Sequence, residues 1–251
     1  MPETGLMMNR QMLKAASLNE LAESAARVFA EVTTEAIKAR GIAYVALSGG
    51  STPKSIYAKL SRQEYCQSIQ WDHIHFFVSD ERCVALSSED SNYGNAERLL
   101  FDKVPVSHDV LHPLANPELD AAAAALNYEK TILETVPRGS DGVPRFDLIF
   151  LGMGPDGHTA SLFPGTRALG ETARLVVDNF VPKVNANRIT FTFSLLNAAA
   201  NVVFVVAGQD KAGVVGEILG SNSTAYPSGR VRPLHGNLIW MLDEASAARL
   251  G

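Results

Sequence analysis

Residues 146–165 read FDLIFLGMGPDGHTASLFPG, and this stretch decides both the fold and the first hypothesis of function. The run 147–151 is largely apolar and ends in a glycine-rich turn that presents Asp156 and His158. We expect a short helical stretch to follow and to end at Pro164. A bare apolar run between turn residues predicts a buried parallel strand, and α/β proteins bind ligands beyond the carboxyl ends of such strands. An imidazole and a carboxylate two residues apart there predict proton-transfer chemistry.

The remaining chain alternates apolar strands with amphipathic helices, which predicts an α/β fold with a mostly parallel sheet and helices on both faces. No repeat and no convincing linker divides residues 1–251, so we predict a single domain, with the first dozen residues as a candidate for disorder. Strands are expected at 42–48, 71–79, 173–178, 188–194, 201–208 and 237–242, and helices at 18–40, 52–60, 92–100, 117–136 and 209–219.

Composition excludes several classes of protein. The chain has 46% hydrophobic and 20% charged residues, typical of a globular domain. A formal net charge of −5 argues against a dedicated nucleic-acid surface. Two cysteines, Cys66 and Cys83, form neither a disulfide framework nor a metal-ligand spacing, which favours a reducing compartment. No apolar run is long enough to span a bilayer, and no signal-peptide apolar region opens the sequence. We therefore predict a cytoplasmic protein without a membrane partner.

The first polar segment after a strand is Ser48, Gly49, Gly50 and Ser51, followed by Thr52. Thr52 has the character of an N-cap, and Pro53 that of a first helical residue. A strand, a glycine turn and a helix start together offer backbone N–H groups to an anion. The sequence pattern alone is equally consistent with a plain tight turn. The nucleotide-binding patterns GxxxxGK[ST] and GxGxxG are both absent, so a single sugar phosphate is the better candidate.

Two further charged segments follow strands. Asp80, Glu81 and Arg82 come directly after the strand at 71–79, as a surface charge cluster or as the rim of a cleft. Lys211 lies at a helix start, where the helix dipole disfavours a cation, so a bound anion would explain its position better than simple exposure. Because all of these segments follow strands, we expect them to meet at one edge of the sheet.

Histidines were considered as bases and as metal ligands. A helix beginning just after His158 would favour its neutral form, which a general base requires. His73 and His75 share one strand face, but no third ligand accompanies them, so packing is the better interpretation than a metal site. There is no GxSxG elbow and no histidine motif beside either cysteine. Direct attack by water is therefore simpler than a covalent acyl-enzyme.

The motifs resemble those of the 6-phosphogluconolactonase family, in the family's order and from about residue 42 onward. That resemblance implies a three-layer α/β/α sandwich with a Rossmann-like sheet, hydrolysis of 6-phospho-D-glucono-1,5-lactone to 6-phospho-D-gluconate in the oxidative pentose phosphate pathway, and neither metal nor organic cofactor. The stretches that carry it are ALSGGSTPKSIYAKL, FFVSDERCV, SNYGNAERLL, FDLIFLGMGPDGHTASLFPG, RITFTFSLLNAAANVVFVVAG with the DKA that follows, and LIWMLDEASAARL.

The same resemblance implies roles for individual residues. His158 becomes the general base that activates water, with Asp156 and Arg82 at the reacting end. The implied substrate-binding residues are Ser48, Gly49, Gly50, Ser51, Asp80, Arg188 and Lys211. Which basic residue contacts the phosphate and which the lactone is left open.

Two alternative functions are compatible with parts of this pattern. The related glucosamine-6-phosphate deaminase/isomerase family has a glutamate five residues beyond the histidine, where this chain has Phe163. An apolar ring cannot transfer a proton, which argues against that reaction. A non-catalytic sugar-phosphate-binding module usually carries a DNA-binding segment, and no helix-turn-helix precedes residue 42. The expected partner is thus a small sugar-phosphate lactone rather than nucleic acid, with the protein a monomer or a weak homodimer.

Overall fold

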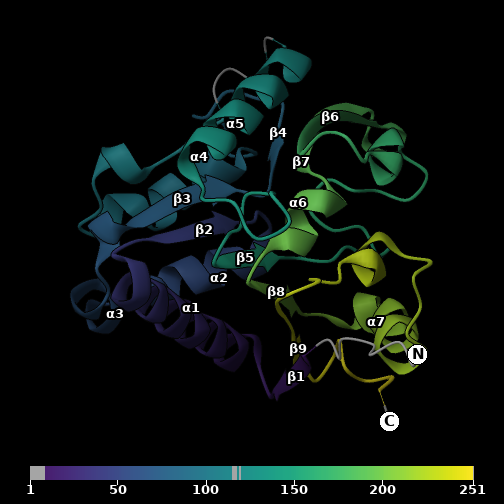
Figure 1. Cartoon of the computed structure of the whole chain (residues 1–251). Helices are drawn as coiled ribbons and strands as arrows, with labels where there is room; N and C mark the ends of the chain where they lie inside the picture. The colour runs from purple at the N-terminus through teal and green to yellow at the C-terminus, as the bar shows by residue number, and fades with distance from the viewer. Residues whose placement is uncertain (1–8, 115–117, 119, 251) are drawn as a thin grey trace, which may run out of the picture.

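Continuous apolar runs form the central strands of the molecule. The computed structural model describes residues 9–114, 118 and 120–250. Six parallel strands form the main sheet, in the order β1–β9–β8–β5–β2–β3 (Figure 1). All residues of β2 and β5 are buried, as expected for strands covered on both faces. The strands are β1 (Asn9–Ala15), β2 (Ala43–Leu47), β3 (Ile74–Val78), β5 (Leu148–Leu151), β8 (Asn201–Val206) and β9 (Asn237–Asp243).

Helices connect these strands and cover both faces of the sheet. Figure 1 shows α1 on one side of the main sheet and α5 on the other. The helices are α1 (Leu18–Arg40), α2 (Ser51–Leu60), α3 (Gln63–Ser68), α4 (Asn92–Leu99), α5 (Ala121–Thr135), α6 (Phe193–Ala198) and α7 (Ala212–Gly220). The predicted α/β fold with a mostly parallel sheet flanked by helices is therefore confirmed.

The first helix shows how local sequence determines its own bounds. Ser17 caps α1 by accepting a hydrogen bond from the Glu20 N–H, and Gly41 ends the helix with φ of 81°. Its apolar face carries Phe29, whose ring centroid lies 5.9 Å from that of Trp71 and 6.5 Å from that of Phe150. This stack joins the helix to the sheet.

The order of the strands creates the place where a ligand can bind. From β2 the chain moves outward to β3, and from there it returns across the sheet to β5, β8 and β9. Because such crossovers are right-handed, the connecting helices leave β2 and β5 on opposite faces. The carboxyl ends of these two neighbours therefore border a crevice at the switch point of the sheet.

A second, antiparallel sheet was not predicted. It contains β4 (Asp80–Arg82), β7 (Ala186–Phe191) and β6 (Val176–Val181), in that order. The segment expected to be a charged rim is thus the edge strand β4, and the two strands expected near 173–178 and 188–194 belong to this sheet. In Figure 1 this sheet stands beside the carboxyl ends of the main sheet. It holds Arg82 in register with Arg188.

Several local predictions were wrong. The candidate disordered segment includes Asn9–Met12, which belongs to β1 and pairs with β9; residues 1–8 lie outside the described residues. Thr52 does not cap α2, because Gly50 is the N-cap, at φ of 108°, and makes no side-chain bond. The expected strand at 71–79 begins only at Ile74, after a 3-10 turn at Trp71–His73. The helix expected at 117–136 begins at Ala121, with residues 117 and 119 outside the described set.

The most consequential error concerns the segment after His158. No helix forms between His158 and Pro164; the chain turns instead, with a bridge between Thr159 and Leu162 and with Ala160 at φ of 47°. A helix dipole therefore cannot set the protonation of His158. The helices within the described ranges include none that is long and apolar enough to cross a membrane.

Candidate functional site

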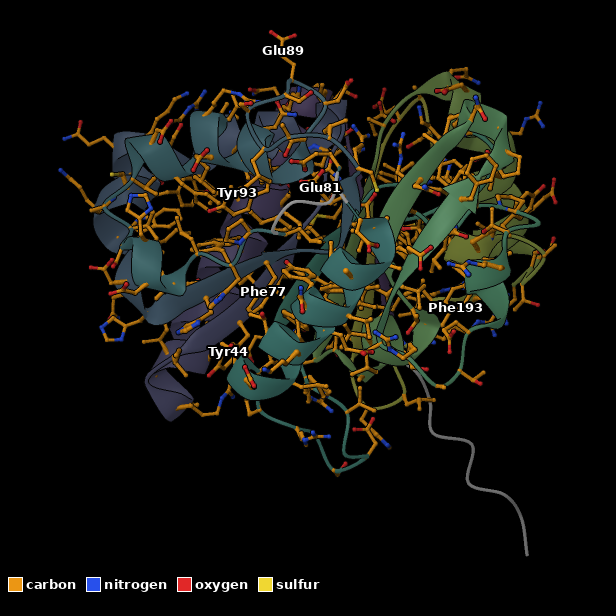
Figure 2. All side chains as sticks on the ribbon, turned by 90° about the horizontal axis from the view of Figure 1, so that it is seen from above. Tyr44, Phe77, Glu81, Glu89, Tyr93 and Phe193 are labelled. Carbon is orange, nitrogen blue, oxygen red and sulfur yellow. The ribbon has the colours of Figure 1, made fainter. Side chains whose placement is uncertain are left out.

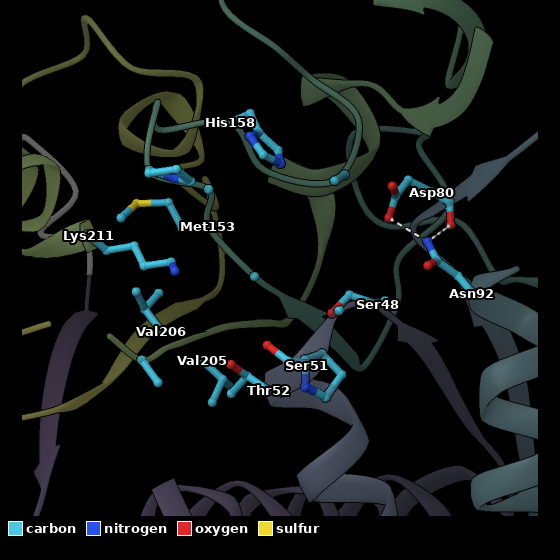
Figure 3. Close-up of a pocket in the computed structure, with 18 of the residues that line it drawn as sticks. Ser48, Ser51, Thr52, Asp80, Asn92, Met153, His158, Val205, Val206 and Lys211 are labelled. Carbon is cyan, nitrogen blue, oxygen red and sulfur yellow. Dashed lines mark hydrogen bonds between the residues drawn. The ribbon is translucent and has the colours of Figure 1, made fainter. Parts of the chain in front are cut away.

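A cavity of about 240 Å³ opens at the carboxyl ends of β2, β5 and β8. Eight of the ten residues proposed from the sequence line it, while Asp156 and Arg188 do not. Figure 3 shows His158 and Lys211 facing the same opening as the Ser48–Ser51 loop and the pair Asp80–Asn92. The eight lining residues are Ser48, Gly49, Gly50, Ser51, Asp80, Arg82, His158 and Lys211. The four segments therefore meet as expected, while the roles of their residues stay predictions.

The Asp156 carboxylate holds the His158 ring. Its Oδ1 lies 2.5 Å from Nδ1 of His158 and 3.2 Å from the His158 backbone nitrogen, which donates to it. Burial would raise the pKa of Asp156, but hydrogen bonds from Lys183 and His158 outweigh it and lower that pKa to about 2. An ionised carboxylate only accepts, so Nδ1 of His158 must carry a proton. The neutral imidazole then has its lone pair on Nε2, where a proton acceptor is needed.

Lys183 is a functional candidate that the sequence did not reveal. Its Nζ lies 2.6 Å from Oδ2 of Asp156, the oxygen that His158 does not use. The lysine lies in the connection between β6 and β7, a sheet that the sequence analysis did not anticipate. No spacing or motif links position 183 to position 156, so only the folded chain brings them together.

Phe163 covers one face of the His158 imidazole. Its ring centroid lies 3.9 Å from that of His158, with the rings 16° from parallel. Phe163 is buried. The apolar ring therefore fixes the orientation of His158 without offering a group that exchanges protons.

Two glycines of this turn leave room for the rings of His158 and Tyr226. A Cβ atom on Gly154 would lie 2.1 Å from Cε1 and 2.2 Å from Nδ1 of His158. Gly157 has φ of 75°, and a Cβ there would lie 2.5 Å from the Tyr226 ring. These two glycines are therefore required by close contacts as well as by the turn.

The loop after β2 leaves polar groups without partners. Ser48 is buried, and its Oγ has no hydrogen-bond partner among the described residues. The first turn of α2 receives no side-chain cap, so its N–H groups remain available. A Cβ on Gly49 would lie 1.7 Å from Oδ1 of Asn92, so only glycine allows this loop to pack against α4. The helix N-terminus and the Ser48 hydroxyl together suit an anion.

Asp80 and Asn92 form the opposite wall of the cavity. Asn92 donates to the backbone oxygen of Asp80 at 2.8 Å and to its Oδ1 at 3.3 Å, and Ser161 donates to Oδ2 at 2.7 Å. The sequence analysis did not single out Asn92, although it lines the cavity. This network fixes the Asp80 carboxylate beside the ligand space.

The neighbouring Glu81 lies in the interior, whereas Glu89 projects into solvent (Figure 2). Burial raises the pKa of Glu81, although it accepts four hydrogen bonds. The donors are the backbone N–H groups of Arg82, Asn92 and Tyr93 and the Ser91 hydroxyl. One carboxylate thus ties the start of α4 to β4, which sets the position of Asn92 and Arg82.

The basic residues differ in their relation to the cavity. Arg82 lines it and donates to the backbone oxygen of Asp90 at 2.8 Å. Arg188 lies beside Arg82 in the small sheet, where burial and the Arg82 charge lower its pKa. Lys211 lines the cavity, and its Nζ lies 2.8 Å from Asp210. This pairing itself explains a lysine at the start of α7, so the dipole argument for a bound anion loses its force.

Metal ligation finds no support in the described part of the chain, where no three His, Cys, Asp or Glu side chains are grouped to hold an ion. His73 and His75, which share one strand face in the sequence pattern, have separate partners: His73 contacts the Gly41 backbone oxygen at 2.9 Å. His75 instead lies 2.8 Å from His112, ring nitrogen to ring nitrogen.

Comparison with known proteins decides the family. Residues 16–240 match the model of the glucosamine-6-phosphate isomerases/6-phosphogluconolactonase family. A 6-phosphogluconolactonase of Synechocystis sp. is 38% identical over 252 residues, which cover 99% of this chain and 98% of the relative. The chain belongs to the 6-phosphogluconolactonase family.

Two further members agree with this assignment. The chloroplastic 6-phosphogluconolactonase 3 of Arabidopsis thaliana is 39% identical over 232 residues, covering 90% of this chain and 70% of the relative. The solved structure of 6-phosphogluconolactonase from Trypanosoma brucei superposes with a TM-score of 0.86 at 30% identity, covering 97% of this chain and all of that one. The 6-phosphogluconolactonase fold thus extends over nearly the whole chain.

The substitution Gly154→Ala tests whether this 6-phosphogluconolactonase family member needs the space that Gly154 leaves for the His158 ring. We expect turnover to fall about a hundredfold, because the new methyl group displaces the His158 ring. The measurement is the steady-state rate with the lactone substrate of the 6-phosphogluconolactonase family. Thermal unfolding of the variant is measured as well, and its transition should be unchanged. Gly170→Ala is the control, since nothing lies within 4 Å of a Cβ there. Equal rates for the two variants would contradict the expectation.

Proposed function

We propose that this protein hydrolyses 6-phospho-D-glucono-1,5-lactone to 6-phospho-D-gluconate, with His158 as the general base. The observation that carries the proposal is the 2.5 Å contact between Nδ1 of His158 and Oδ1 of Asp156. It assigns the ring proton to Nδ1 and leaves Nε2 as the basic nitrogen of a cavity-lining ring. The name shared by the relatives supports the choice of substrate.

The phosphate group is assigned to the Ser48–Ser51 loop and the start of α2. Free N–H groups, the unpartnered Ser48 hydroxyl and the nearby Lys211 all favour a doubly charged anion. Arg188, which the family resemblance implies as a substrate-binding residue, lies outside the cavity lining, so we assign it no contact with the phosphate. With the phosphate held there, the lactone extends toward His158.

In the reaction, Nε2 of His158 accepts a proton as a water oxygen adds to carbonyl carbon C1 of the lactone. Negative charge then develops on the former carbonyl oxygen, where Arg82 or backbone N–H groups stabilise it. When the C1–O5 bond breaks, the His158 imidazolium returns its proton to O5. The product has a carboxyl group at C1, which ionises at neutral pH, and a hydroxyl group at C5.

Asp156 supports both stages without changing its own charge. It accepts from Nδ1 while His158 is neutral, and it stabilises the imidazolium after proton transfer. Its pKa of about 2 keeps it ionised throughout. Asp80 is positioned to accept hydrogen bonds from sugar hydroxyl groups, since its carboxylate is fixed by Asn92 and Ser161.

The deaminase/isomerase alternative is disfavoured by the stacked Phe163. That reaction needs a proton-transferring group where this chain has a buried phenyl ring 3.9 Å from the imidazole. A binding module without catalysis would not need a histidine held in one tautomer. No cofactor enters the proposed reaction. The proposed oligomeric state is a monomer or a weak homodimer. A cytoplasmic location stays a prediction, because one relative is chloroplastic.

The proposed function is tested by supplying freshly made 6-phosphogluconolactone and glucosamine 6-phosphate in parallel. Acid release from the lactone above its spontaneous opening, with no ammonia from the amino sugar, is expected. Ammonia release would instead establish the deaminase reaction, and inertness toward both compounds would favour the binding module.

His158→Ala should lower kcat by about a hundredfold or more, because the general base is lost while the phosphate loop is intact. Binding of 6-phosphogluconate, measured by calorimetry, should persist. The exposed His108 gives a matched control, His108→Ala, with wild-type turnover. Near wild-type turnover of the His158 variant would remove this residue from its assigned role.

Lys211→Ala should raise KM about tenfold and spare kcat, because a phosphate contact made equally in ground and transition states is lost. Initial rates over a range of lactone concentrations separate the two constants. A defect confined to kcat would place Lys211 at the reacting end instead.

A further inference from the structure

Lys183 donates to the Asp156 carboxylate of the His158–Asp156 pair from the connection between two strands of the second sheet. It lies in the tight connection Pro182–Val184 between β6 and β7, which ends at Asn185 with φ of 47°. The pairing of Val181 with Ala186 closes this hairpin directly behind the lysine. The ammonium group is thus carried by a short, hydrogen-bonded connection.

The position of Lys183 is poorly suited to a purely stabilising role. Its side chain is 59% exposed, and an exposed ion pair contributes little to folding stability. Its partner Asp156 is only 22% exposed and holds the imidazole through its other oxygen. The contact therefore has its main consequence at the ring.

We propose that Lys183 is a positioning residue for the hydrolysis: by binding Oδ2 of Asp156 it holds the carboxylate with Oδ1 on Nδ1 of His158. The proposal rests on the function proposed above. Lys183 does not line the cavity, so we assign it no contact with substrate. Without it, Oδ2 would face water, and the carboxylate could rotate away from the ring.

Charge balance gives this role a measurable signature. Asp156 contacts His158 directly and Lys183 contacts Asp156, while Asp80, Arg82 and Lys211 line the same cavity as His158. The ammonium group offsets the carboxylate charge that the imidazole experiences. Removing it leaves that charge unbalanced, so His158 should take up a proton more readily. The acidic limb of the pH–rate profile should then move to higher pH.

The experiment compares Lys183→Met with Lys183→Arg. Lys183→Met should lower kcat about tenfold, because the ring loses its fixed geometry, and should leave KM within about twofold. It should also shift the acidic limb of the pH profile of kcat/KM to higher pH. Lys183→Arg should have the wild-type rate and the wild-type pH profile. The control is Lys130→Met, another exposed lysine paired with a carboxylate, Glu134, far along the chain. An unchanged pH profile in Lys183→Met would overturn the proposal.

A double-mutant cycle tests whether Lys183 acts through Asp156. Adding Lys183→Met to Asp156→Asn should cause no further loss of kcat, since the carboxylate is already absent. An additive loss, or an effect on KM alone, would assign Lys183 to the substrate instead and overturn the positioning role. If His158→Ala retains turnover, the proposed general-base role of His158 fails. If His158→Ala is inactive while Lys183→Met behaves as wild type, only this inference fails.

Discussion

The Asp156 carboxylate is the contact on which the chemistry of the cavity depends. Its two oxygens serve different partners, Nδ1 of His158 and Nζ of Lys183. Because those hydrogen bonds keep it ionised despite partial burial, it acts only as an acceptor and sets the tautomer of the imidazole. The Phe163 ring is stacked on the imidazole and restricts its movement. The proposed general base is thus held by hydrogen bonding and packing rather than by a helix dipole.

The small antiparallel sheet connects both ends of the ligand space. Its strand β4 carries Asp80 and Arg82, and its β6–β7 connection carries Lys183. The buried Glu81 ties β4 to the start of α4, where Asn92 packs against Gly49 of the proposed phosphate loop. The phosphate loop and the histidine therefore share one frame, although they follow different strands of the main sheet. Under the proposed function, this frame fixes the distance between the phosphate group and the reacting carbon of the substrate, which catalysis by positioning requires.

The main sheet and the convergence of polar segments were predictable because their signals are local. Apolar runs such as 147–151 and 201–206 specify buried strands, and the residues directly after them meet at one sheet edge. The second sheet was not predictable in this way. Asp80–Arg82 pairs with Arg188–Thr190 more than a hundred residues away, and charged residues in a three-residue strand have no apolar pattern. A role for Lys183 was not predictable for the same reason, since its contact with Asp156 depends on that sheet.

The turn after His158 forms where the sequence predicts a helix. Thr-Ala-Ser-Leu has helical propensity, but Thr159 donates to the Gly152 backbone oxygen and Ser161 donates to Asp80. These tertiary bonds outweigh a propensity of a few tenths of a kcal/mol per residue. The same turn places Phe163 on the imidazole, five residues after the histidine. A helix there would have directed that position elsewhere, so the turn itself creates the apolar contact on the imidazole, which the proposed function uses to disfavour the deaminase/isomerase reaction.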